Sequence, residues 1–120
     1  MASSTPEKQL AFIVLLQTAA GFFELSGALA KTVFKSVEEV TAAVPPADEG
    51  ADALLVGRLW ATALALAVLT TRLDSLSGEW MVLAKKSRKW IRKNVAVLGV
   101  EGTNKAEKTA ALEALAVAFL

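Results

Sequence analysis

The amino-acid sequence predicts an all-α fold, a compact bundle of about five helices around a central apolar helix. Alanine and leucine are abundant in a chain that is 54% hydrophobic and lacks tyrosine, and such a composition favours helices over strands. The segment 60–67 is an alanine-rich apolar run, as expected for a helix that its neighbours bury on every side. The segment 77–94 has an apolar side and a basic side, the pattern of a helix at the surface of a bundle.

A chain of 120 residues is about one domain, and we expect residues 1–120 to be a single helical interaction domain, a C-terminal fragment of a larger protein. The net charge is only +1, so electrostatic attraction to a partner must come from local clusters of charge. The absence of cysteine excludes disulfides and thiolate metal sites. The first residues of the sequence are polar and do not resemble a secretory signal peptide. The longest apolar run, residues 59–69, is shorter than the segment needed to span a bilayer. We therefore expect a soluble, cytoplasmic protein.

Residues 6–19 are predicted to form the first helix. Thr5 is a good capping residue, and Pro6 has the backbone geometry that the first helical turn requires. Gly21 interrupts the helical pattern, and a compact apolar cluster that includes Phe23 follows it.

Two short helices are predicted next. The first begins at Ser26 and carries apolar residues at spacings of three and four, which is an amphipathic stripe. Ser36 and Glu39 form a capping-box pattern that starts the second, and such a cap contributes about 1 kcal/mol. That helix must stop at Pro45. The amphipathic stripe of the helix that begins at Ser26 consists of Leu29, Ala30, Val33 and Phe34.

Three longer helices are predicted in the second half of the chain, after a loop at residues 45–52. Residues 54–72 are apolar nearly all round, so we place this helix at the centre of the bundle. Ser77 is predicted to cap the next helix, which runs to residue 94. Asn104 and Glu107 make a second capping-box pattern, and the last helix follows to the end of the sequence.

The two sides of the helix at 77–94 define a candidate core and a candidate binding surface. At about 100° per residue, its tryptophans point to the apolar side. We expect a structural core that includes Phe23, Trp60, Leu64, Trp80, Leu83 and Trp90. The opposite side carries the cations Lys85, Lys86, Arg88, Lys89, Arg92 and Lys93.

These six cations could bind an acidic protein surface, and a solvated face that keeps the bundle soluble is the other interpretation. Direct nucleic-acid binding is not expected, because no exposed aromatic residue is interleaved with the charges. Adsorption to a membrane would require Trp80 and Trp90 to face lipid instead of the core, so we do not expect it.

Signals of catalysis are sparse. The chain has no histidine, cysteine or tyrosine, which removes the commonest general bases, nucleophiles and zinc ligands. Two pairs of adjacent acids, Glu38–Glu39 and Asp48–Glu49, would diverge by about 100° on a helix instead of converging on one atom. No glycine-rich phosphate loop is present. We expect no enzyme, no catalytic residue, no metal site and no cofactor.

Three stretches carry a resemblance to a known family. They are residues 16–25 (LQTAAGFFEL), residues 60–66 (WATALAL) and the helix that holds Glu79, Trp80 and Trp90. In this order and spacing they resemble the C-terminal helical domain shared by the vault poly(ADP-ribose) polymerase and by intracellular proteins that combine a VIT domain with a von Willebrand factor A domain.

The resemblance spans about residues 10–95, with two departures. Phe23 stands where the family usually has a tryptophan, and Val68 stands where a second tryptophan often follows the alanine run. The resemblance implies a non-catalytic protein–protein interaction module that docks a protein onto the major vault protein, inside the vault ribonucleoprotein particle. A peripheral membrane-binding or pore-forming helical protein is the alternative.

Overall fold

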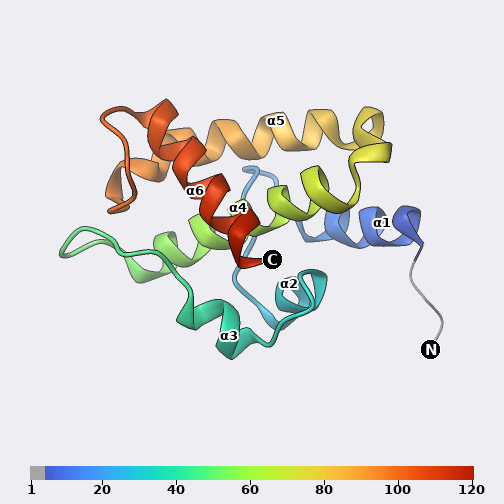
Figure 1. Cartoon of the computed structure of the whole chain (residues 1–120), viewed down its shortest axis with the longest axis horizontal. Coiled ribbons are helices and arrows are strands. Elements are labelled where there is room, and N and C mark those ends of the chain that lie inside the picture. The colour runs from blue at the N-terminus through green and yellow to red at the C-terminus, as the bar shows by residue number, and fades with distance from the viewer. Residues whose placement is uncertain (1–4) are drawn as a thin grey trace.

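The computed structural model describes residues 5–120, and this part of the chain is an all-α bundle without a β-strand (Figure 1). It contains six α-helices where about five were predicted, together with two short 3₁₀ turns. The α-helices are α1 (Pro6–Leu16), α2 (Gly27–Thr32), α3 (Val37–Ala42), α4 (Ala53–Arg72), α5 (Ser77–Asn94) and α6 (Lys105–Phe119). The 3₁₀ turns are η1 (Asp74–Leu76) and η2 (Val95–Val97).

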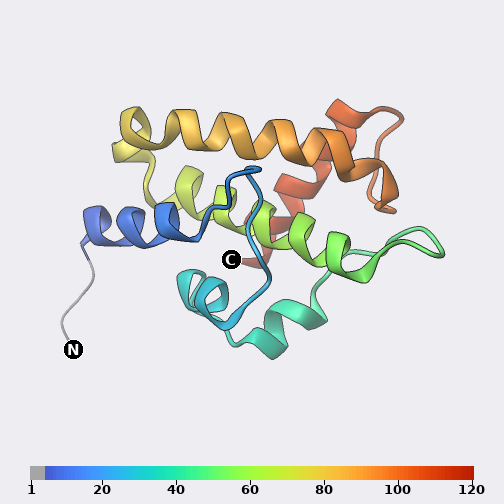
Figure 2. The same ribbon diagram turned by 180° about the vertical axis from the view of Figure 1, so that it is seen from behind.

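Helix α4 is the centre of the bundle, as its sequence predicts. In Figures 1 and 2, α5 runs along one side of it, α6 crosses it, and α2 and α3 lie on the opposite side from α5. Residues 61–69 are all buried, and the indole Nε1 of Trp60 donates a hydrogen bond to the Val40 carbonyl oxygen at 3.0 Å. The helix is long and apolar enough to cross a bilayer, with a mean hydropathy of 1.8, but 67% of that stretch is buried inside the protein.

Helix α1 begins at the Thr5 cap, as predicted, since the Thr5 hydroxyl accepts from the Lys8 amide at 3.2 Å. The helix ends at Leu16, three residues earlier than expected, because Gln17 adopts an extended conformation. The chain then turns at Gly21, which has φ +107°. A Cβ there would come within 3.0 Å of the Lys86 carbonyl oxygen, so glycine lets this turn lie directly against α5.

The predicted stripe of α2 is only partly correct. Leu29, Ala30 and Val33 are buried, but Phe34 is exposed and has φ 58°, in the left-handed region. Helix α2 has already ended at Thr32, so Phe34 no longer follows helical periodicity.

The capping box of α3 is confirmed in both directions. The Ser36 hydroxyl accepts from the Glu39 amide at 3.1 Å, and the Glu39 carboxylate accepts from the Ser36 amide at 3.0 Å. The latter bond holds the pKa of Glu39 below its ordinary value of 4.5. In α6 the Asn104 side chain caps the Glu107 amide as predicted, whereas the Glu107 carboxylate turns to the amide and hydroxyl of Thr103.

The predicted cap of α5 is wrong. Ser77 has helical dihedral angles and is the first residue of α5, and no side-chain hydrogen bond caps this end. The chain enters α5 directly from η1, which leaves no extended residue to act as a cap. The entry is fixed instead by Trp80, whose Nε1 donates to the Leu73 carbonyl oxygen at 2.7 Å.

Candidate functional site

Four of the six predicted core residues are fully enclosed. Phe23, Trp60 and Leu64 are buried, and Trp80 retains only 6% of its surface. The burial of Trp80, with its N–H satisfied, leaves it unable to face lipid as membrane adsorption through α5 would require.

The other two, Leu83 and Trp90, are half-buried on the flank of α5. The Trp90 ring packs on Phe22 with 5.1 Å between centroids. The Arg58 guanidinium lies 4.4 Å from the centroid of the same phenyl ring, and it also forms an ion pair with Glu24 at 3.0 Å. The flank of α5 is therefore closed by the loop that follows α1.

A polar network positions α5 against that loop, and sequence periodicity did not reveal it. The Gln17 side-chain amide donates to the Ser87 hydroxyl at 2.9 Å and to the Leu83 carbonyl oxygen at 3.1 Å. The Ser87 hydroxyl in turn donates to the Gly21 carbonyl oxygen at 2.6 Å. Gln17 and Gly21 belong to the first stretch that carries the family resemblance, so this stretch has a structural role in orienting α5.

The six predicted cations of α5 do not form one uniform face. Lys85, Lys86, Lys89, Arg92 and Lys93 are exposed. Arg88 is half-buried, and its guanidinium forms a two-pronged ion pair with Glu113 of α6 at 3.1–3.3 Å. Arg88 therefore ties two helices together, and its role in binding a partner stays a prediction.

The exposed cations also lie on different sides of the helix. Lys85, Lys89 and Arg92 line one shallow groove beside Arg88, whereas the stem of Lys86 lies against the turn at Gly21. Within residues 5–120 the only ion pairs are Arg58–Glu24 and Arg88–Glu113, so Lys85, Lys89 and Arg92 have no acidic partner there.

The groove on α5, which we call the basic groove, has an apolar component. It is lined by Met81, Lys85, Arg88, Lys89 and Arg92 and has a volume of about 500 Å³. Met81 is 59% exposed at one end, and the neighbouring Val82 is also exposed. Cations around an accessible thioether can bind an acidic surface that carries an apolar side chain.

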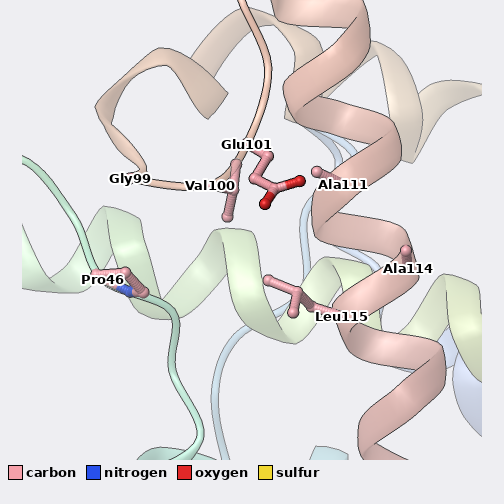
Figure 3. Close-up of a pocket in the computed structure, with 7 residues that line it drawn as sticks. All are labelled: Pro46, Gly99, Val100, Glu101, Ala111, Ala114 and Leu115. Atoms are coloured by element: carbon pink, nitrogen blue, oxygen red, sulfur yellow. The ribbon is translucent and has the colours of Figure 1, made fainter.

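A second, more apolar cavity lies between α6 and the segment after η2 (Figure 3). Its volume is about 480 Å³, and Glu101 is its one ionisable lining residue. The backbone wall is held by the Gly99 amide, which donates to the Pro46 carbonyl oxygen at 2.7 Å. The lining residues are Pro46, Gly99, Val100, Glu101, Ala111, Ala114 and Leu115.

A single carboxylate in an apolar cavity has no second group with which to share a proton or a metal ion. Within residues 5–120, no three side chains of the metal-binding types lie together. Comparison of the chain with protein-family models, with curated proteins and with solved structures finds no match.

Proposed function

We propose that this chain is a non-catalytic protein-docking module and that its basic groove binds an acidic protein surface. The observation that carries the proposal is the set Lys85, Lys89 and Arg92, which surrounds exposed Met81 without an acidic partner in residues 5–120. Arginine and methionine are enriched in protein interfaces, and a patch of one charge speeds encounter with a partner of the opposite charge.

The resemblance to the vault-docking domain makes the major vault protein the first partner to test, in the cytoplasm. The first stretch of the resemblance has a structural role here, since Gln17 and Gly21 hold α5 in place through Ser87. In this proposal the motif orients the helix, and the cations of the groove select the partner.

The absence of an enzymatic role is part of the same proposal. Histidine, cysteine and tyrosine are missing from the sequence, and the cavity of Figure 3 offers only the Glu101 carboxylate. A docking surface requires only shape, charge and apolar area, all of which the basic groove supplies.

The test is co-sedimentation of the folded domain with vault particles assembled from recombinant major vault protein. The double variant Lys85→Glu/Lys89→Glu places two like charges against the acidic partner, so we expect binding to weaken about tenfold or more. The matched control is Lys86→Glu/Lys93→Glu, which makes the same change in charge outside the groove. Circular dichroism checks that both variants fold.

Two results would contradict the proposal. If the parent domain does not sediment with vault particles at tens of micromolar, the vault partner is wrong. If the domain binds and the two double variants weaken binding equally, the attraction is general and the groove has no special role.

A further inference from the structure

The outer side of α1 is apolar and uncovered. Residues 10–16 are all apolar, yet only Leu10 and Ile13 are buried against the bundle. Phe12 is exposed, and Leu15, one turn further along the same side, is 82% exposed. An apolar helix in a globular protein is ordinarily covered, so this side of α1 is a surface in need of explanation.

Phe34 adds a second anomaly next to α1. It follows α2 in the position where helices commonly end with a left-handed glycine, and it has φ 58°. Both hydrogen bonds of that motif are present, from the Phe34 amide to the Lys31 carbonyl oxygen at 3.1 Å and from the Lys35 amide to the Ala30 carbonyl oxygen at 3.0 Å. The phenyl ring is 68% exposed, so packing does not account for a strained aromatic residue here.

The two features meet in one place. Phe12 and Phe34 line the same groove of about 360 Å³, together with the buried Val68 of α4. Figure 2 shows α1 and α2 side by side at this corner, and they pack against each other. We call Phe12, Leu15 and Phe34 the apolar corner.

Cations flank the apolar corner. Lys31 lines the groove, and Lys8 lies one turn before Phe12 on the same side of α1. The Arg72 guanidinium lies 5.0 Å from the centroid of the Phe34 ring. None of the three cations forms an ion pair within residues 5–120. The acids Glu7 and Glu79 line a depression on the other flank of α1, and Leu15 borders that depression as well.

We propose that the apolar corner binds the surface of anionic lipid bilayers. Exposed phenylalanine and leucine side chains enter the boundary between headgroups and acyl chains, while lysine and arginine stay at the level of the phosphates. Leu15 and Phe34 are 82% and 68% exposed instead of enclosed in a pocket, which suits a bilayer better than the anchor residue of a peptide. The corner lies on other helices than the basic groove, so this proposal does not depend on the docking function.

The test is flotation of the folded protein with vesicles of phosphatidylcholine and phosphatidylserine, compared with vesicles of phosphatidylcholine alone. We expect binding to the anionic vesicles that decreases as salt rises. Phe34→Gly should weaken binding about tenfold, because it removes the most accessible aromatic ring. This variant folds readily, since glycine adopts the left-handed conformation without strain.

Matched variants separate the apolar corner from α5. Lys8→Glu/Lys31→Glu should abolish flotation, whereas Lys85→Glu/Lys89→Glu carries the same change in charge and should retain it. Val82→Ser removes an equally exposed apolar side chain from α5 and should also leave flotation unchanged.

Three results would overturn the proposal. The first is flotation of Phe34→Gly at the parent level, and the second is loss of flotation only when the α5 cations are reversed. The third is no binding to anionic vesicles at low salt, which would leave an acidic peptide as the occupant of the groove between Phe12 and Phe34.

Discussion

Helices α1 and α4 have similar apolar sequences and opposite environments. From residue 10 to residue 16, α1 is as free of polar side chains as the middle of α4. Every residue of α4 from 61 to 69 is buried, whereas α1 buries one side only. An apolar helical sequence therefore predicts that the helix is buried, but it does not say whether residues of the same chain or of a binding partner bury it.

The difference follows from position in the bundle. Helix α4 packs against α2, α5 and α6, and its alanines, which carry only a methyl group, allow these neighbours to approach closely. Helix α1 lies at the edge and packs mainly against α2 and α4. The outer side of α1 is thus an apolar surface that the bundle leaves exposed, and it is where we infer a second binding surface.

The largest expected difference is in the free energy of unfolding when one leucine in α4 and one leucine in α1 are each replaced by alanine. Leu64→Ala should lower the free energy of unfolding by about 2–5 kcal/mol, because it leaves a cavity among fully buried neighbours. Leu15→Ala should change it by less than about 0.5 kcal/mol, because that side chain is already in solvent. Urea unfolding followed by tryptophan fluorescence measures both. Similar losses in the two variants would break the comparison between α1 and α4.

A smaller effect concerns the polar network behind α1. Ser87→Ala should cost about 1–3 kcal/mol, because the buried Gly21 carbonyl oxygen loses its hydrogen bond of 2.6 Å and keeps only the Gln17 amide at 3.4 Å, while that amide loses an acceptor. Ser77→Ala is the control, since Ser77 makes no capping bond. The same urea titration applies, and a loss no larger than that of the control would show that the network does not hold the end of α1.

Phe34→Gly should have a smaller effect of the opposite sign. We expect a gain of about 0.5 kcal/mol, because relief of the left-handed conformation slightly exceeds the added entropy of glycine in the unfolded chain. Thermal unfolding by circular dichroism measures it. A loss of stability would mean that the phenyl ring packs better than its exposure indicates, and the case for a functional aromatic residue at the apolar corner would fail.

The smallest effect is a pH dependence at the short helix α3. The folded-state pKa of Glu39 lies below its ordinary value of 4.5, so its capping bond contributes stability above that pH and loses it as pH falls through the lowered pKa. Glu39→Gln should therefore lower the melting temperature at pH 6 but not at pH 3. An equal difference in melting temperature at both pH values would mean that the cap stabilises α3 by hydrogen bonding alone and that the charge of Glu39 contributes nothing.

Features that depend on local spacing were predictable from the sequence. The central helix and the Ser36–Glu39 box needed only periodicity and a three-residue pattern. Phe34 was placed wrongly on a buried stripe because α2 ends two residues earlier, which periodicity does not reveal. Ser77 was placed wrongly as a cap because η1 already supplies the first turn before α5.

Features that depend on distant parts of the chain were not predictable. The cations of α5 were identified, but Arg88 finds its acid in Glu113, 25 residues away. Gln17 bonds with Ser87 across 70 residues, and no spacing within either helix points to that pair. The apolar corner joins α1 to the end of α2 only through tertiary packing.

Native-state hydrogen exchange tests the contrast between the two helices most directly. The amides of residues 61–69 in α4 should exchange only by global unfolding, so their opening free energy should equal the free energy of unfolding from urea titration. The amides of residues 10–16 in α1 should exchange through a smaller opening of lower free energy, because the outer side of that helix is exposed. Equal protection of α1 and α4 in the isolated protein would contradict this account.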